Sequence, residues 1–487
     1  MKKLYCYFLF VLLSLPVIIP AAAQAVDWEK DAVTKHTVTI DGKKVGYTAR
    51  AGFLPLVEDG KTTAQIFYIA YTRDDTSNPA DRPVTFSFNG GPGSSSIWMH
   101  MAFLGPRKVL YDDEGFALQP PYRLADNEHS ILDATDLVFI DPAATGFSRM
   151  MPGEEPHKYH GVMEDIASVG EFIRLYVTRN NRWGSPKFII GESYGTTRAS
   201  GLTGYLQDRH RMYINGTILV SMTDLGYKAG GDLNLMTILP HYTATAWYHK
   251  KLPAEIQSKP LREVLDMAEA FATGSYSLAL TRGNTLSSKD KDNIAAEMAR
   301  FTGLDKGFIL KSDLRVSAPS FRRELLSRED LTVGRLDSRY TGLEAGTPGM
   351  AFSTDPAMEA WNGPFTGAIN QYFHQELDVR FDMEYNVFGD VRPWKGRNDV
   401  FVGQMLQRAM IQNPYLNVLV LEGYYDGACD YFTARYTFSH LDLAGKTKDR
   451  IHFRFYECGH MMYIRKADLA KARGDLLEFI LLSLPQS

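Results

Sequence analysis

Cysteine is scarce in this chain of 487 residues: there are only three, and Cys6 lies in the N-terminal segment. A disulfide framework therefore cannot be the basis of the fold, and no Cys/His cluster has the spacing of a zinc site. Charge of one sign is also lacking, because the formal net charge is −4 and no long run of like charges occurs. We expect no metal, no cofactor and no nucleic-acid partner.

Long apolar runs are missing outside the N-terminus. There, two lysines precede an apolar stretch that is broken by prolines and followed by three alanines. This order is typical of a cleavable signal peptide, which we place at residues 1–23, with cleavage after Ala23 or Ala25. An uncleaved anchor is the alternative, since the stretch is nearly long enough to span a bilayer. We expect a secreted or periplasmic protein without a stable membrane span after cleavage.

Strand-like and helix-like segments alternate in two separate parts of the chain. Short apolar strands are predicted at residues 84–88, 136–140, 187–190, 214–222, 416–421 and 451–456. Helical patterns lie between them, and the alternation predicts a mostly parallel sheet with helices on both faces. Antiparallel strands are predicted to lead into this sheet, from about residue 33 to residue 73.

The alternation is lost in the middle of the chain, where the pattern is mostly helical. The domain organisation that follows is a core formed by residues 24–222 and 400–487. A largely helical cap insertion, residues 223–399, splits this core.

A candidate nucleophile, Ser193, follows the predicted strand at residues 187–190. It lies in the pentapeptide GESYG, residues 191–195, and a helical pattern begins directly after it. A strand, Gly-x-Ser-x-Gly and a helix together form the nucleophile elbow of the α/β-hydrolase fold. An ordinary strand-to-helix turn is the alternative, but the context favours a serine hydrolase.

A glycine-rich loop follows the early strand at residues 84–88 and reads NGGPGSSS, residues 89–96. In the α/β-hydrolase fold such a loop supplies one oxyanion donor, and the N–H of the residue after the nucleophile, Tyr194, supplies the other. A phosphate-binding loop is not expected, because no Gly-Lys-Ser/Thr follows.

The other triad members should follow the last two strands, in the order acid and then histidine. Asp426 follows the strand at residues 416–421, and His460 follows the strand at residues 451–456. Asp430 is a rival acid that lies further into its loop. The predicted triad is therefore Ser193, Asp426 and His460.

The chain resembles the serine carboxypeptidases in several motifs. These are the loop at residues 89–96, the elbow at residues 191–195 and the block DPAATGFS at residues 141–148. Asp426 in a G-x-x-D block and His460 before a methionine match two further family blocks. The resemblance covers most of the chain outside the insertion, and it implies a secreted serine carboxypeptidase that acts on peptides with a free C-terminus.

The resemblance also implies roles for the residues around the nucleophile. The N–H groups of Gly91 and Tyr194 would form the oxyanion hole, and Asn89, Gly90 and Glu192 would receive the C-terminal carboxylate of the substrate. An ionised Glu192 would repel that carboxylate, whereas a protonated one can donate to it. We therefore expect better peptidase activity at acidic than at alkaline pH.

Several positions depart from the family pattern. Ser87 and Ser94 replace a usual Trp and Cys, and Met462 and Tyr463 replace Val-Pro. Phe103 stands where the family has a Glu that helps to keep the equivalent of Glu192 protonated. With almost no cysteine, the chain resembles a bacterial-type member.

The sequence leaves two other functions open. An esterase or acyltransferase would use the same triad, and a binding protein on a hydrolase scaffold would not use it. Cys429 and Cys458 lie close to Asp426 and His460 in the sequence. A disulfide between them is possible if their strands are neighbours, but free thiols are the default expectation.

Overall fold

The structure is a computed structural model that describes residues 27–227, 230–343, 354–396, 400–443 and 445–485. The predicted signal peptide, residues 1–23, and its cleavage point lie outside the described residues. Among the helices of the described residues, none combines the length and apolarity needed to cross a membrane.

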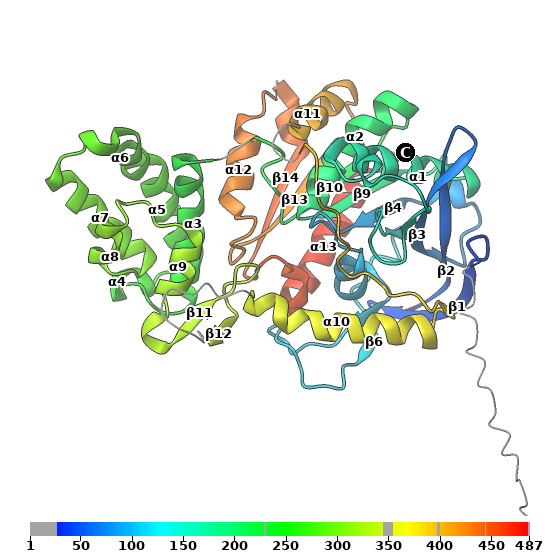
Figure 1. The fold of residues 1–487 in the computed structure, drawn as a ribbon, viewed down its shortest axis with the longest axis horizontal. Coiled ribbons are helices and arrows are strands. Elements are labelled where there is room, and N and C mark those ends of the chain that lie inside the picture. Colours follow the sequence, from blue (N-terminus) through cyan, green and yellow to red (C-terminus); the bar gives the residue numbers. More distant parts are fainter. Residues whose placement is uncertain (1–26, 228–229, 344–353, 397–399, 444, 486–487) are drawn as a thin grey trace, which may run out of the picture.

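One large twisted sheet forms the centre of the described chain (Figure 1). Its strand order is β1-β2-β3-β7-β4-β9-β10-β13-β14, with β8 paired to β3. Strands β1 to β3 and β7 pair antiparallel, and from β7 to β14 every pairing is parallel. The strands are β1 (Ala32–Ile40), β2 (Lys43–Glu58), β3 (Lys61–Arg73), β4 (Val84–Phe88), β7 (Asp136–Ile140), β8 (Arg149–Met150), β9 (Lys187–Glu192), β10 (Gly216–Val220), β13 (Asn417–Gly423) and β14 (Ile451–Tyr456).

The inner parallel strands are buried on both faces because the chain covers both sides of the sheet with helices, whereas the edge strand β14 is mostly half-buried. In β9, Phe188 and Ile190 pack into one core and Ile189 into the other, as the two-residue period of a strand requires. The core that contains Ile189 also contains the apolar sides of α1 (Val162–Arg179), α2 (Tyr194–His210), α11 (Val402–Gln412) and α12 (Tyr431–His440). The opposite core contains α10 (Pro356–Gln375) and α13 (Lys466–Ser483). This arrangement confirms the predicted α/β-hydrolase fold.

A separate helical lobe stands beside the sheet, at the left of Figure 1. It has its own apolar core, and the long helix α3 packs against α12 at the edge of the sheet domain. Its helices are α3 (Asp232–Tyr248), α4 (Ala254–Gln257), α5 (Leu261–Phe271), α6 (Ser277–Arg282), α7 (Ser288–Thr302), α8 (Lys306–Lys311) and α9 (Ala318–Glu324). A short antiparallel pair, β11 (Leu331–Val333) and β12 (Thr341–Leu343), follows the lobe.

Within the predicted largely helical insertion, residues 223–399, the described helices pack in two different cores. Its last helix, α10, buries Trp361, Phe365 and Tyr372 in the core of the main sheet rather than in the lobe. The chain then returns over the core, where Phe388 forms an isolated bridge with Ser94. A mostly helical pattern does not show which core receives the apolar face of a helix such as α10.

Candidate active site

Ser193 lies in the sharp turn between β9 and α2. Its φ of 58° and ψ of −128° are strained for a residue with a side chain, as in a nucleophile elbow. A Cβ on Gly191 would lie 2.1 Å from the carbonyl oxygen of Gly195, so glycine is required where the strand and the helix meet. The turn places Ser193 at the N-terminus of α2, where the helix dipole favours a developing negative charge.

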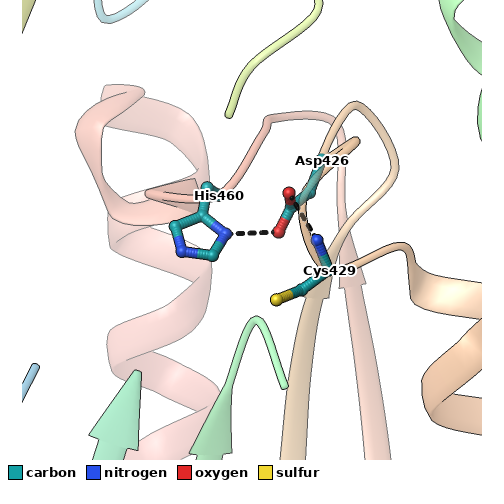
Figure 2. Close-up of side chains that lie close together, drawn as sticks. All are labelled: Asp426, Cys429 and His460. Atoms are coloured by element: carbon teal, nitrogen blue, oxygen red, sulfur yellow. Dashed lines mark hydrogen bonds and ion pairs between the residues drawn. The ribbon is translucent and has the colours of Figure 1, made fainter. Parts of the chain in front are cut away.

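Asp426 and His460 follow the parallel neighbours β13 and β14, and their side chains meet beyond the ends of these strands (Figure 2). His460 Nδ1 and Asp426 Oδ2 are 2.6 Å apart, and both side chains are buried. Burial alone would lower the pKa of His460, but the adjacent Asp426 carboxylate outweighs it and raises the pKa above its ordinary value. Asp426 therefore orients the imidazole and stabilises its protonated form.

The rival acid, Asp430, has a different task. Its side chain caps α12 by accepting hydrogen bonds from the backbone N–H and the hydroxyl of Thr433, both at 2.8 Å. The structure therefore brings Asp426, and not Asp430, to the histidine.

Ser193 and His460 line one cavity of about 400 Å³. Within the described chain, the Ser193 hydroxyl forms no hydrogen bond, so it is not tied to another group. Asn89, Gly90, Gly91, Glu192 and Tyr194 line the same cavity. All eight residues predicted for catalysis, oxyanion binding or carboxylate binding therefore lie at or directly behind one site, with Asp426 behind His460.

The glycine-rich loop passes directly over the start of α2. A Cβ on Gly90 would lie 2.4 Å from the backbone nitrogen of Tyr194, and Gly91 has a φ of +102°. Both features need glycine, and both bring main chain close to the nucleophile turn. The loop thus adds backbone groups to a cavity that already contains Ser193, as an oxyanion hole requires.

Glu192 is almost completely buried, although it lines the cavity. Its Oε2 accepts hydrogen bonds from the Asn89 amide and, at 2.8 Å, from the Tyr463 hydroxyl. Burial raises the pKa of Glu192 to about 7, and these hydrogen bonds offset only part of that rise. Near neutral pH a large fraction of Glu192 is therefore uncharged.

Two residues that depart from the family pattern are in contact with each other. The rings of Phe103 and Tyr463 are stacked, with centroids 4.7 Å apart and planes at 8°. Phe103 comes from the segment after the glycine-rich loop, and Tyr463 follows His460 by three residues. No motif links positions that are so far apart in the chain, so the sequence does not indicate this contact.

A segment of the predicted insertion reaches the triad, and the sequence carried no signal for it. Residues 335–340, between β11 and β12, are called the anchor segment below. The segment binds the acid loop through two backbone hydrogen bonds, from Gly427 N to Arg335 O and from Ser338 N to Tyr425 O, both at 2.9 Å.

The anchor segment also binds the histidine loop. His460 N donates to Leu336 O at 2.7 Å, and the Asp337 carboxylate accepts from Gly459 N at 3.2 Å. Arg339 forms a fully buried ion pair with Asp337 at 2.6 Å and donates to the Cys458 sulfur at 2.8 Å. One short segment therefore positions the loops of Asp426 and His460 relative to each other.

Cys429 and Cys458 are both free thiols, which agrees with the expectation from the sequence. Cys458 is held by Arg339, whereas Cys429 lies beside the triad, where its backbone N–H donates to Asp426 (Figure 2). The ligand atoms of Asp426, Cys429 and His460 lie within 4.8 Å of one another. Burial and nearby carboxylates raise the pKa of the Cys429 thiol, and a thiol that keeps its proton is a poor metal ligand.

The sheet order, the elbow and the Asp426–His460 pair define a serine hydrolase of the α/β-hydrolase class. Within this class, residues 40–219 match the family described as serine carboxypeptidase. The matched part includes the glycine-rich loop and the elbow, and it covers less than half of the chain.

Curated proteins are similar to this chain over short segments. The pheromone-processing carboxypeptidase KEX1 of Saccharomyces cerevisiae is 32% identical over 156 residues, which is 30% of this chain and 20% of the yeast protein. Serine carboxypeptidase-like 8 of Arabidopsis thaliana is 26% identical over 220 residues, 45% of this chain and 48% of the plant protein. The chain thus spans about a fifth of the length of the yeast relative that it matches.

A solved structure agrees in fold. The crystal structure of Kex1(Δ)p, a prohormone-processing carboxypeptidase from Saccharomyces cerevisiae, superimposes with a TM-score of 0.53. The comparison covers 89% of this chain and 91% of that chain at 16% identity. At this identity the comparison supports the α/β-hydrolase fold alone.

Proposed function

We propose that this protein is a serine carboxypeptidase, which removes C-terminal residues from peptides through a Ser-His-Asp acyl-enzyme mechanism. The observation that carries the proposal is the position of Glu192. This acid lines the cavity that contains Ser193, and burial raises its pKa to about 7. A neutral acid beside the nucleophile can donate a hydrogen bond to the C-terminal carboxylate of a peptide.

Binding through this carboxylate selects the last peptide bond of the substrate. Asn89 and Gly90 line the cavity together with Glu192 and complete the candidate carboxylate site. Because Glu192 and Ser193 are adjacent in the chain, a carboxylate held at Glu192 leaves little room for further residues before the nucleophile. The short reach between anchor and nucleophile therefore favours exopeptidase activity.

The chemical steps follow from the triad. His460 takes the Ser193 proton as the serine attacks the scissile carbonyl, and the N–H groups of Gly91 and Tyr194 stabilise the oxyanion. His460 then protonates the leaving amine, and the departing amino acid carries the bound carboxylate away. Water repeats the cycle on the acyl-enzyme. Throughout, Asp426 keeps the imidazole oriented through the 2.6 Å contact.

The decisive experiment compares a blocked dipeptide that has a free C-terminus with its C-terminal amide. We expect kcat/KM to fall strongly on amidation, and longer peptides to be shortened stepwise from the C-terminus. Ser193→Ala, which removes the nucleophile, is the control for contaminating peptidases. Equal turnover of acid and amide, or preferred turnover of simple esters, would instead favour the esterase or acyltransferase reading. Failure of a fluorophosphonate to label Ser193 would favour a non-enzymatic binding protein.

We also propose that the protein is secreted or periplasmic and is a bacterial-type member of its family. The lysines, the apolar stretch and the alanines of residues 1–23 support export, and the scarcity of cysteine supports the bacterial type. N-terminal sequencing of the exported protein tests the first point. A mature chain that begins after Ala23 or Ala25 is expected, whereas a retained N-terminus would contradict cleavage.

A further inference from the structure

The two carboxyl oxygens of Glu192 have different surroundings. Oε2 accepts from both the Asn89 amide and the Tyr463 hydroxyl. Oε1 is buried and has no hydrogen-bond partner in the described chain. In the neutral acid, the proton therefore belongs on Oε1, because Oε2 already accepts two hydrogen bonds.

We propose that Tyr463 is a positioning residue for substrate recognition. Its hydroxyl, together with the Asn89 amide, occupies Oε2 of Glu192 and so leaves the acidic proton on Oε1, where it can be donated to the C-terminal carboxylate of a peptide. This inference rests on the proposed carboxypeptidase function. It assigns a role to a residue that no family motif contains.

The direction of the Tyr463 hydroxyl is fixed by packing. Tyr463 is completely buried, and its ring stacks on Phe103 with the planes at 8°. Burial and the adjacent Glu192 raise the pKa of Tyr463 well above its ordinary value, so the hydroxyl keeps its proton and donates at every working pH. The stacked pair thus holds a permanent donor against Oε2.

Other charged groups around Glu192 set the background for this contact. Across the cavity, His460 favours the ionised form of Glu192, and Asp426 behind it disfavours that form. Arg335 of the anchor segment lines the cavity, and its charge lowers the pKa of His460. Below the glycine-rich loop, Arg198 donates to the Asn89 carbonyl oxygen at 2.7 Å, and its charge is paired with Asp165. These groups stay in place when the Tyr463 hydroxyl is removed, so the effect of that hydroxyl can be measured separately.

The test replaces Tyr463 by Phe, which keeps the stacked ring and removes one hydroxyl. We measure the preference ratio, defined as kcat/KM for a blocked dipeptide acid divided by kcat/KM for its amide, from pH 5 to pH 9. At pH 6 we expect the ratio to fall roughly fivefold to tenfold, the effect of one hydrogen bond, mainly through KM of the acid. The Tyr463 hydrogen bond lowers the pKa of Glu192. Its loss should therefore move the alkaline decline upward by about one pH unit or less.

The matched control is Tyr276→Phe in the helical lobe. It removes an equally buried hydroxyl, which donates to Leu314 O at 2.8 Å, far from the cavity in the fold. We expect Tyr276→Phe to leave the preference ratio and the pH profile as they are. Fluorophosphonate labelling of Ser193 shows whether each variant has a folded site. If Tyr463→Phe is not labelled, Phe103→Leu replaces it, because loss of the stack should lower the ratio in the same direction.

Glu192→Leu separates failure of the inference from failure of the proposed function. If Glu192→Leu leaves the preference ratio unchanged, the carboxylate site itself is refuted. If Glu192→Leu lowers the ratio and Tyr463→Phe neither lowers it nor moves the alkaline decline, only the role of Tyr463 is refuted. If both are right, adding Tyr463→Phe to Glu192→Leu causes no further loss, because Tyr463 acts through Glu192.

Discussion

Replacement of Glu192 by Gln should remove the alkaline decline of peptidase activity. Glutamine has the shape of the neutral acid: its oxygen can accept from Asn89 and Tyr463, and its amide group can donate where Oε1 of Glu192 would. It does not ionise between pH 5 and pH 9. The variant therefore keeps the donor for the substrate carboxylate at every pH of the assay.

The size of the effect follows from the pKa of Glu192, which burial raises to about 7. Above this pH the neutral fraction falls about tenfold per pH unit, so at pH 9 only about one molecule in a hundred has a neutral Glu192. We expect kcat/KM of the wild type for a blocked dipeptide acid to follow this fraction on the alkaline side and to approach a tenfold loss per pH unit up to pH 9. In Glu192→Gln this alkaline decline should be absent, and kcat/KM at pH 9 should lie within about threefold of its maximum.

The assay is a pH series of kcat/KM for the acid and for its amide, with both proteins. The decrease on the acid side, where His460 becomes protonated and can no longer act as base, should remain in both proteins, because the raised pKa of His460 comes mainly from Asp426. A wild-type rate that does not decline from pH 6 to pH 9 would refute the reasoning. An equally steep decline in Glu192→Gln would do so too, since another group would then be responsible.

Three further outcomes are expected. Asp426→Asn should lower kcat about a thousandfold or more because the imidazole loses its orienting partner. Asp430→Ala should instead lower the melting temperature by loss of the α12 cap and leave kcat near the wild-type value. Asp337→Asn should lower the free energy of unfolding, measured in urea, by about 3 kcal/mol, because it leaves the buried Arg339 without its charged partner. A loss below about 1 kcal/mol would contradict the importance of this ion pair. Reductant should leave the intact mass unchanged, and alkylation of the native protein should modify Cys429 before the fully buried Cys458, with the reverse order counting against the described positions.

The parts of this protein that sequence reasoning could predict are those in which local pattern and chemistry coincide. The strand at residues 84–88 and the strand at residues 451–456 have the predicted bounds, because both are short runs rich in aromatic and β-branched residues, which favour strands. The elbow at Ser193 was recognisable because its glycines are required by local crowding. The candidate carboxylate site, Asn89, Gly90 and Glu192, could be named only through the resemblance to the serine carboxypeptidases.

The unpredicted parts depend on contacts between distant segments. The stack of Phe103 on Tyr463 joins positions from opposite ends of the core, and nothing in either neighbourhood indicates the other. The apolar face of α10 shows the same limit, because periodicity marks a buried face without indicating its partner. The position of Asp430 further into its loop already favoured Asp426 as the triad acid, but only the structure shows that Asp430 caps α12.

The anchor segment, residues 335–340, connects the helical lobe to the loop that positions the catalytic base, His460. Its backbone hydrogen bonds to the loops of Asp426 and His460 form only when the chain beyond the lobe has folded back onto the core. If the lobe is exchanged between two related proteins, the exchange can therefore change the position of the triad as well as the substrate preference. A chimera that keeps a working triad should have its junctions on the lobe side of β11, so that residues 331–343 stay with the core whose histidine they support.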